Sequence, residues 1–460
     1  MVAKSKKGNN VDFRSFLSLL QSEGELVRVK QDVSTEFELA AVTAKLDGKQ
    51  AVLFEKVRGS KIEVACNVVG TPKKFYLAVA GSREAGQADI KKAIRARINE
   101  ALASLSAPAM MQGSASFEKN SSRNLHDLPI VTHFEKDAGP FITSSVVFAR
   151  DQEKGNQNQS THRMLCLDEM HLAIRMVEGR HLHKCFTYAR DHGEDLKVAI
   201  AIGVHPAVSI AAAYQAAYGV DEMLIANSLL EGKLTLSKTS YSQLCVPSHT
   251  EILLEGRILK DRTQEEWMVE MLRTYDFKRK QPVFELERIK FRDRAIYHDI
   301  LPGYAEHRLL MGLPVEAKIF DYIKNVLPTT EAVHLTDGGS NWLAAVIQIK
   351  KRLEGEPKNA LMAAFCAHPS LKMATVVDDD IDPTDPVAVE YAIATRCQAD
   401  RDFIIMPNTK GSSLDPSSDQ ANLLTTKVGI DATASLLKPK ERFEIARIPG
   451  QEKTRLSDFL

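Results

Sequence analysis

The run ITSSVVFA at residues 142–149 begins a series of short apolar segments in the middle of the chain, followed by RMLCL at 163–167, LAIRMV at 172–177 and VAIAIG at 198–203. Three further apolar runs occupy residues 250–254, 283–289 and 295–300. Short runs rich in β-branched residues, bounded by turn-forming residues, are typical of strands. This density of strands predicts a barrel or sandwich core between about residues 130 and 300.

Helical patterns flank and interrupt this core. Phe13, Phe16, Leu17 and Leu20 recur at helical spacing before Gly24, and helices are also expected near 90–102, 207–217 and 222–230. After residue 310, helices near 317–325, 359–367 and 387–396 alternate with strands at 345–350, 374–377 and 403–407. The pattern predicts an α/β (α+β) protein with three domains, residues 1–115, 116–310 and 311–460.

Composition limits the classes of partner. The 460 residues contain 60 Lys plus Arg and 60 Asp plus Glu, so the formal net charge is zero and we expect no nucleic acid and no anionic membrane as partner. The six cysteines are spread singly without a C-x-x-C pair, which is typical of reduced thiols. Because no uninterrupted run of about 18 apolar residues and no signal-peptide pattern occurs, a cytoplasmic location is expected.

Common catalytic motifs are missing from the sequence. It has no Walker A loop, no G-x-G-x-x-G, no G-x-S-x-G and no H-E-x-x-H. Polar side chains nevertheless gather at the edges of predicted strands and helices in the middle third: Asn158, His162, Arg163, His181, Glu222, Glu265 and Glu270.

Four ordered motifs in this region resemble the UbiD-type decarboxylases. They are NQSTHR at 158–163, RMVEGRH at 175–181, DEMLIANSLL at 221–230 and LCVPSHTEILLEG at 244–256. The resemblance implies an enzyme that removes CO2 from an unsaturated carboxylic acid with prenylated FMN as cofactor. It also implies a central split β-barrel that binds the flavin, flanked by N-terminal and C-terminal α/β regions, a homo-oligomer formed through the C-terminal region, and a flavin prenyltransferase that supplies the cofactor.

The resemblance implies a metal site and a set of flavin contacts. Asn158, His181 and Glu222 match ligands of a divalent metal, Mn2+ or Mg2+, with K+ as a further candidate ion; these hard donors suit such metals. The alternative is that Asn158 is a turn residue, His181 a surface or core histidine, and Glu222 an exposed acid in the first turn of a helix. The positions that match cofactor contacts are Thr161, His162, Arg163, Arg175, Met176, Val177, Arg180 and His181.

The implied catalytic residues are Arg163, Glu265 and Glu270. Many family members have E-G-P-[FY]-G-[DE] where this chain has EEWMVE at 265–270. Keeping the spacing of the two carboxylates makes Glu265 the ionised partner of Arg163 and Glu270 the proton donor, in an apolar wall formed by residues 267–269. The alternative is that Arg163 is a surface charge and that residues 264–273 form a helix with its carboxylates facing solvent.

Two later segments bear on the substrate. RKQPVFELERI at 279–289 and AIYHDILPGYAEHRLLMGLP at 295–314 resemble the archaeal branch that contains anhydromevalonate phosphate decarboxylases. Those enzymes convert trans-anhydromevalonate 5-phosphate to isopentenyl phosphate, and the resemblance makes His298, His307 and Arg308 candidates to contact the phosphate. An aromatic or heteroaromatic acid decarboxylase and a non-catalytic flavin-binding scaffold are the alternative functions.

Overall fold

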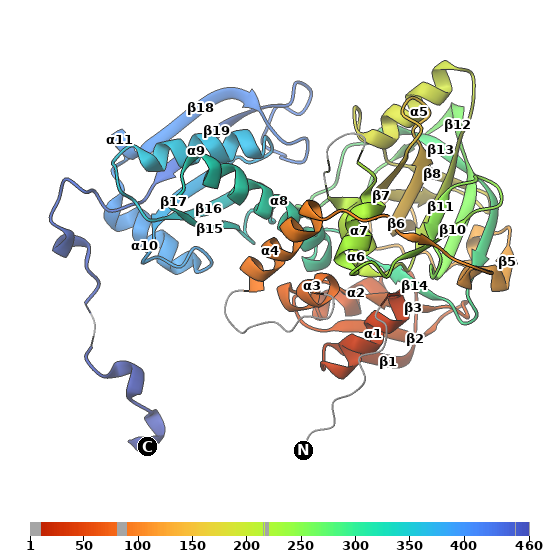
Figure 1. Cartoon of the computed structure of the whole chain (residues 1–460), viewed down its shortest axis with the longest axis horizontal. Coiled ribbons are helices and arrows are strands. Elements are labelled where there is room, and N and C mark those ends of the chain that lie inside the picture. The colour runs from red at the N-terminus through yellow and green to blue at the C-terminus, as the bar shows by residue number, and fades with distance from the viewer. Residues whose placement is uncertain (1–10, 81–89, 215, 217–219, 447, 460) are drawn as a thin grey trace. The chain divides into compact units, whose positions relative to one another are not determined.

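The computed structural model describes residues 11–80, 90–214, 216, 220–446 and 448–459 (Figure 1). The chain divides into two compact units, Met1–Val315 and Glu316–Leu460. The basic residues near the start of the chain lie outside the described residues, as does part of the helix expected at 207–217.

A closed barrel of six antiparallel strands forms the centre of the first unit (Figure 1). Around the barrel the order is β12 (Ile252–Glu266), β9 (Leu196–Ile202), β6 (Phe141–Arg150), β7 (Gln157–Cys166), β8 (His171–Ile174) and β13 (Arg279–Phe291). The barrel closes because β13 pairs with β12 as well as with β8. The predicted fold class, with a central β-barrel, is confirmed.

A second sheet of the first unit combines three strands that precede the barrel in the sequence with one strand that follows it. Its order is β1 (Leu26–Val33), β2 (Ala51–Val57), β3 (Glu63–Cys66) and β14 (Ile296–Asp299). β14 follows the last barrel strand but pairs in parallel with β3. Shorter strands are β4 (Ala109–Met110), β10 (Thr235–Lys238) and β11 (Cys245–Pro247), which form one small sheet, and β5 (Asn120–Ser122), which pairs with β13. The division of this part at residue 115 stays a prediction.

Several helices of the first unit begin at a residue whose side chain caps them. Asp12 accepts a hydrogen bond from the Ser15 backbone in a capping box, and Asp221 caps the helix that begins at Glu222. The helices are α1 (Phe13–Ser22), α2 (Glu38–Lys45), α3 (Pro72–Val79), α4 (Ile90–Ala103), α5 (His181–Asp191), α6 (Pro206–Ala213) and α7 (Glu222–Leu229), with single 3-10 turns at Ser116–Lys119 and Leu125–Asp127.

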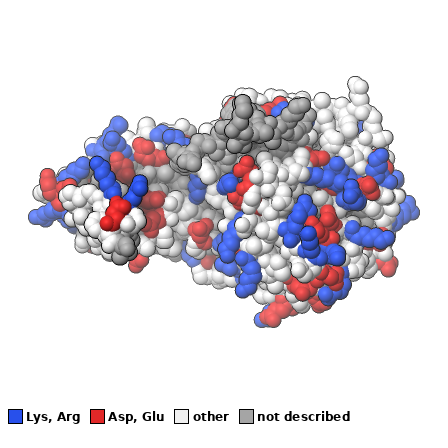
Figure 2. Space-filling model, turned by 90° about the horizontal axis from the view of Figure 1, so that it is seen from below, with Lys and Arg blue, Asp and Glu red and all other residues white. Residues whose placement is uncertain are grey.

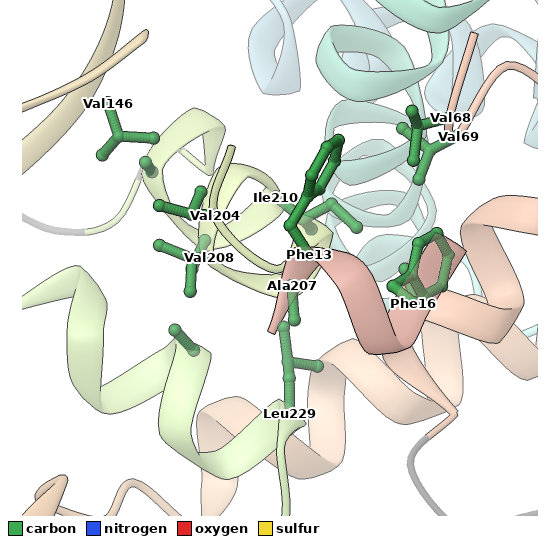
Figure 3. Packing of buried hydrophobic residues seen from close by; sticks show 14 of the residues in the cluster. Phe13, Phe16, Val68, Val69, Val146, Val204, Ala207, Val208, Ile210 and Leu229 are labelled. Atoms are coloured by element: carbon green, nitrogen blue, oxygen red, sulfur yellow. The ribbon is translucent and has the colours of Figure 1, made fainter. Parts of the chain in front are cut away.

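One apolar cluster ties α1 to α6 and α7. Phe13 and Phe16 are fully buried, and Ala207 and Val208 of α6 and Leu229 of α7 belong to the same cluster (Figure 3). Burying one phenylalanine side chain contributes roughly 1.5–3 kcal/mol. The predicted helical stripe of α1 therefore holds in place the helix that carries Glu222 at its first position.

The second unit is an α/β sheet, as predicted. Its strand order is β15 (Thr330–Leu335), β16 (Ala344–Ile349), β17 (Met373–Asp378), β19 (Leu424–Asp431) and β18 (Phe403–Lys410). The helix α8 (Ala305–Val326) runs from the first unit into the second, where α9 (Glu356–Ala367), α10 (Pro386–Arg396) and α11 (Ala399–Asp402) follow, with 3-10 turns at Lys440–Phe443, Gln451–Lys453 and Leu456–Asp458. Strands β15 and β19 were not among the predicted strands.

The surface reflects the balanced composition. On the face drawn in Figure 2, basic and acidic side chains are interspersed over short distances. No helix within the described ranges has both the length and the apolar character needed to cross a membrane. All six cysteines are free thiols.

Candidate active site

Arg163 on β7 is the centre of a buried charge cluster. Its Nε and Nη2 atoms donate to the two carboxylate oxygens of Glu266, both at 3.0 Å, and Nη2 also donates to Asp276 at 3.0 Å. Nη1 donates to Glu270. Only 10% of the Arg163 side chain is exposed, and burial opposes its charge, but the three carboxylates raise its pKa above the ordinary value. Arg163 is therefore a permanently charged group and not a surface charge.

The prediction that Glu265 pairs with Arg163 is wrong. Successive side chains of a strand point to opposite faces, and β12 continues through Glu266. Glu265 is exposed, whereas the Glu266 side chain is fully buried against Arg163. Keeping the family spacing of the two carboxylates selected the residue on the wrong face of the strand. The alternation along β12 is the signal that identifies Glu266.

Residues 264–273 do not form the helix that the alternative interpretation of the sequence would require. β12 ends at Glu266 and a turn-rich loop follows. The Asp137 carboxylate accepts from the backbone N–H of Val269 at 3.1 Å, and the Trp267 indole N–H donates to the Lys136 carbonyl at 2.8 Å. Two backbone and side-chain contacts with the 133–138 segment thus hold the loop that carries Glu270.

The Glu270 side chain has apolar neighbours in its own loop and is also partly exposed to solvent. Met268 and Val269 are buried, as expected for the wall of a dry pocket, and 19% of the Glu270 side chain is exposed. Trp267 instead lies under the Lys278 ammonium, 4.3 Å from its ring centroid. Glu270 therefore reaches Arg163 on one side and remains accessible for proton exchange on the other.

Asp276 is a third carboxylate that sequence reasoning missed. Burial raises the pKa of Asp276, but Arg163 and Arg279 outweigh it and hold this pKa below the ordinary value. Arg175 lies 3.9 Å from Asp276 and 4.0 Å from Glu266. No motif marks Asp276, because it becomes part of the site only through the fold of the 267–276 loop.

His162 is held as a neutral imidazole next to Arg163. Its Nδ1 lies 2.7 Å from the Arg175 carbonyl, so Nδ1 carries the proton, and Nε2 accepts from the Ser160 hydroxyl at 2.9 Å. Burial lowers the pKa of His162 to about 4. Its side chain can therefore orient neighbouring groups without adding charge.

The other predicted flavin contacts occupy different environments. Met176 is buried, and its backbone N–H donates to the Gln281 side chain at 2.9 Å. Thr161, Val177 and Arg180 are exposed. The structure thus brings Arg175 to the Arg163 cluster and His162 to Ser160 and the Arg175 carbonyl, while the other three side chains lie at the surface of the described chain.

Asn158, His181 and Glu222 converge from three separate elements. Asn158 is on β7, and His181 and Glu222 are the first residues of α5 and α7. The Asn158 Nδ2 atom lies 3.3 Å from His181 Nδ1 and 3.2 Å from Glu222 Oε1. His181 Nδ1 and Glu222 Oε1 are 3.7 Å apart. Asn158 and Glu222 are buried.

This spacing suits a hard divalent cation. Octahedral ligands at about 2.1 Å from a metal stand about 3.0 Å from one another. A half-turn of the Asn158 amide, whose O and N atoms are assigned from hydrogen bonding, directs its oxygen toward the other two groups. Within the residues that the structure describes, no group of three or more His, Cys, Asp or Glu is placed to hold a metal ion, so the candidate set needs the Asn158 amide. The three side chains fit Mn2+ or Mg2+.

The three candidates for a phosphate contact differ in position. His298 is buried, and its Nε2 lies 3.2 Å from Glu306, while Arg308 lies 3.7 Å from Asp47. His307 is near the charge cluster: burial lowers the pKa of His307, and Glu270 and Arg163 act on it electrostatically. Of the three, His307 is the one that the structure brings to Glu270.

Three family models match the chain in series. They are described as the N-terminal, Rift-related and C-terminal domains of 3-octaprenyl-4-hydroxybenzoate carboxy-lyase, UbiD, and they match residues 17–94, 105–305 and 308–432.

Curated relatives from archaea carry a more specific name. An anhydromevalonate phosphate decarboxylase of Methanothermobacter thermautotrophicus is 41% identical over 435 residues, which are 94% of this chain and 99% of that protein. One of Methanocaldococcus jannaschii is 48% identical over 328 residues, 71% of this chain and 77% of that protein.

Solved structures share the fold over nearly the whole chain. The UbiD-class enzyme HmfF from Pelotomaculum thermopropionicum, in complex with FMN, has a TM-score of 0.92 at 37% identity, covering 98% of this chain and 100% of that one. The vanillic acid decarboxylase of Sedimentibacter hydroxybenzoicus in its closed form has a TM-score of 0.82 at 27% identity, covering 98% of both chains.

Proposed function

The chain belongs to the UbiD family of carboxy-lyases, and we propose that it decarboxylates trans-anhydromevalonate 5-phosphate to isopentenyl phosphate with prenylated FMN as cofactor. The observation that carries the proposal is the cluster in which Arg163 contacts Glu266, Glu270 and Asp276. The substrate follows from the archaeal relatives named anhydromevalonate phosphate decarboxylase, at 38–48% identity. The flavin follows from UbiD-class structures described in complex with FMN and prFMN.

Arg163 orients the substrate carboxylate. A guanidinium has five N–H donors, and four hydrogen bonds to the three carboxylates leave one N–H on Nη1. Because Nη1 also contacts Glu270, a carboxylate bound there lies next to the proton donor. Glu266 and Asp276 keep the guanidinium in one orientation, which lowers the entropic cost of positioning the substrate.

Glu270 replaces the departing CO2 with a proton. When bound, the prenylated flavin supplies an acceptor for the electron pair that the breaking carbon–carboxylate bond leaves behind. The protonated Glu270 then delivers its proton to that carbon, and the resulting carboxylate is stabilised by Arg163. Its partly exposed side chain takes up the next proton from solvent. Met268 and Val269 exclude water from the reacting side.

Asn158, His181 and Glu222 would hold a divalent metal, Mn2+ or Mg2+, that binds the flavin phosphate. Two helix N-termini, those of α5 and α7, meet at this point and favour an anionic ligand. His162, Arg175 and Met176 would contact the flavin itself, and the potassium ion remains part of the proposal. We also propose that a flavin prenyltransferase supplies the cofactor, that the chain assembles into a homo-oligomer, and that the protein is cytoplasmic.

An anaerobic assay tests the proposed reaction. Protein loaded with prenylated FMN and Mn2+ is given trans-anhydromevalonate 5-phosphate, and isopentenyl phosphate is detected by mass spectrometry. Product that requires both cofactor and protein supports the proposal. No product from protein with intact cofactor would reject this substrate, and turnover of a hydroxybenzoate would then favour an aromatic acid decarboxylase. No turnover of either acid favours a non-catalytic scaffold.

A further inference from the structure

Arg273 has a backbone conformation that its side chain does not favour. Its φ is +61°, in the left-handed region that non-glycine residues rarely adopt. The residue lies in the turn that carries Glu270: its N–H donates to the Glu270 carbonyl at 2.8 Å, and the Glu270 N–H donates to the Thr274 carbonyl at 2.9 Å. Residues held in such conformations are over-represented at active sites and in ligand-binding segments.

The Arg273 side chain is held against the segment that follows β14. A Cβ atom added to Gly303 would lie 2.4 Å from Cγ of Arg273, so the absence of a side chain at Gly303 allows the arginine to cross it. The guanidinium then lies 5.1 Å from the centre of the Tyr304 ring. Stacking on an aromatic ring orients the planar guanidinium and leaves its N–H edge available.

Arg273 differs from the neighbouring arginines, Arg163 and Arg175, in its ion pairing. Arg163 donates to three carboxylates, and Arg175 lies within 4.0 Å of two of them. Arg273 is exposed, and no carboxylate of the described residues forms an ion pair with it. The turn that carries Glu270 therefore also carries one cation that is available for an anion from solution.

A second donor lies on the same segment. The Gly303 N–H donates to Nδ1 of His307 at 3.1 Å, so the neutral imidazole carries its proton on Nε2. Glu270 and Arg163 act on His307 electrostatically. His307 thus offers a neutral N–H donor on the segment that the Arg273 side chain crosses at Gly303.

We propose that Arg273, oriented by Tyr304, is the residue that binds the phosphate group of the substrate, with the Nε2–H of His307 as a second donor. This inference rests on the proposed function, because it requires a substrate with an anionic group far from its carboxylate. An arginine fork matches two oxygens of a phosphate, and Arg163 has only one N–H left. The site thus separates the two anionic ends of the substrate between two arginines.

Direct binding tests the role of Arg273 independently of turnover. Isopentenyl phosphate and inorganic phosphate are titrated into the holoenzyme by calorimetry, with wild type, Arg273→Gly, Arg273→Lys and Arg294→Gly compared. Glycine relieves the left-handed backbone, so Arg273→Gly should fold normally. Arg294 is the matched control, since it is an exposed arginine with φ +47° outside the charge cluster.

We expect Arg273→Gly to weaken isopentenyl phosphate binding on the order of tenfold or more, Arg273→Lys to restore part of it, and Arg294→Gly to match wild type. KM for the phosphorylated substrate should rise with Arg273→Gly while kcat changes by less than about threefold. Binding and KM that are unchanged in Arg273→Gly would overturn the role of Arg273. Isopentenyl phosphate binding that depends on Arg273, without turnover by wild type, would instead reject the proposed reaction and keep the phosphate site.

Discussion

Arg163 and Glu266 form a bidentate ion pair, with 3.0 Å between Nε and Oε2 and 3.0 Å between Nη2 and Oε1. Arg163 is on β7 and Glu266 ends β12, and these strands are three places apart in either direction around the six-strand barrel. The pair therefore joins opposite strands. It fixes the guanidinium relative to Glu270, so the geometry of the site depends on closure of the barrel.

Glu266→Gln should damage both stability and activity, whereas Glu265→Gln should do neither. The Glu266 side chain is fully buried, and removing its charge leaves Arg163 less compensated, which lowers the free energy of unfolding by about 3 kcal/mol. Turnover should fall by at least about 100-fold because the guanidinium loses its fixed orientation. Urea unfolding and the anaerobic assay measure the two effects. Equal losses in both variants would contradict the assignment of Glu266.

Glu270→Gln should strongly reduce turnover while leaving cofactor binding intact. The amide keeps the size of the side chain but supplies no acidic proton, so turnover should fall by about 100-fold or more. The visible spectrum of the bound flavin serves as the control for loading. Turnover at the wild-type rate would remove Glu270 from the mechanism.

Loss of Glu222 should weaken metal binding selectively. Glu222 Oε1 lies 3.2 Å from Asn158 and 3.7 Å from His181, so Glu222→Gln removes the one anionic donor of the set. We expect Mn2+ affinity, measured by electron paramagnetic resonance of free Mn2+, to fall at least about tenfold. His192→Gln, at the exposed end of α5, is the matched control. Equal Mn2+ affinity in both variants would place the metal elsewhere.

Gly303→Ala should disturb the Glu270 turn more than its backbone strain alone explains. Gly303 has φ +75°, and an added Cβ would lie 2.4 Å from Arg273 Cγ and 2.9 Å from the Glu270 carbonyl oxygen. Gly24 has φ +71° with open space around it, so Gly24→Ala measures the strain alone, about 1 kcal/mol. Gly303→Ala should cost more stability than this and also reduce turnover. Similar losses in the two variants, with normal turnover, would show that the close approach is unimportant.

Acid should destabilise the first unit between about pH 6.5 and 4. Burial lowers the pKa of His162 to about 4 and that of His205 to about 3. As pH falls below 6.5, the unfolded chain takes up protons that the folded protein does not, so stability falls by roughly 1.4 kcal/mol per pH unit for each group. Below the pKa values of the folded protein, these histidines are protonated in both the folded and the unfolded state, so they cause no further loss of stability.

Urea unfolding at several pH values measures this effect. His162→Gln should flatten the slope between pH 6.5 and 4.5, because the glutamine does not titrate. An identical slope in the variant and in wild type would show that His162 is not one of the titrating groups.

The sequence alone determined the broad architecture. The apolar runs around 142–149 and 198–203 became barrel strands, and Phe13, Phe16, Leu17 and Leu20 became the buried face of α1. These outcomes depend on periodicity and burial, which act over a few neighbouring residues and are visible in the order of amino acids. Ordered motifs also indicated the family and singled out Arg163 and Glu270, which the structure brings into contact.

Only the tertiary structure decided which acids surround Arg163. Glu265 and Glu266 are adjacent and chemically equivalent in the sequence, and the pleat of β12 turns just one of them inward. Asp276 reaches Arg163 through a loop held by contacts with Asp137, more than a hundred residues earlier in the chain. Arg273 likewise acquires its position from Gly303 and Tyr304. Such long-range packing depends on how the barrel closes and on which face each side chain takes, and local sequence patterns do not encode those distances.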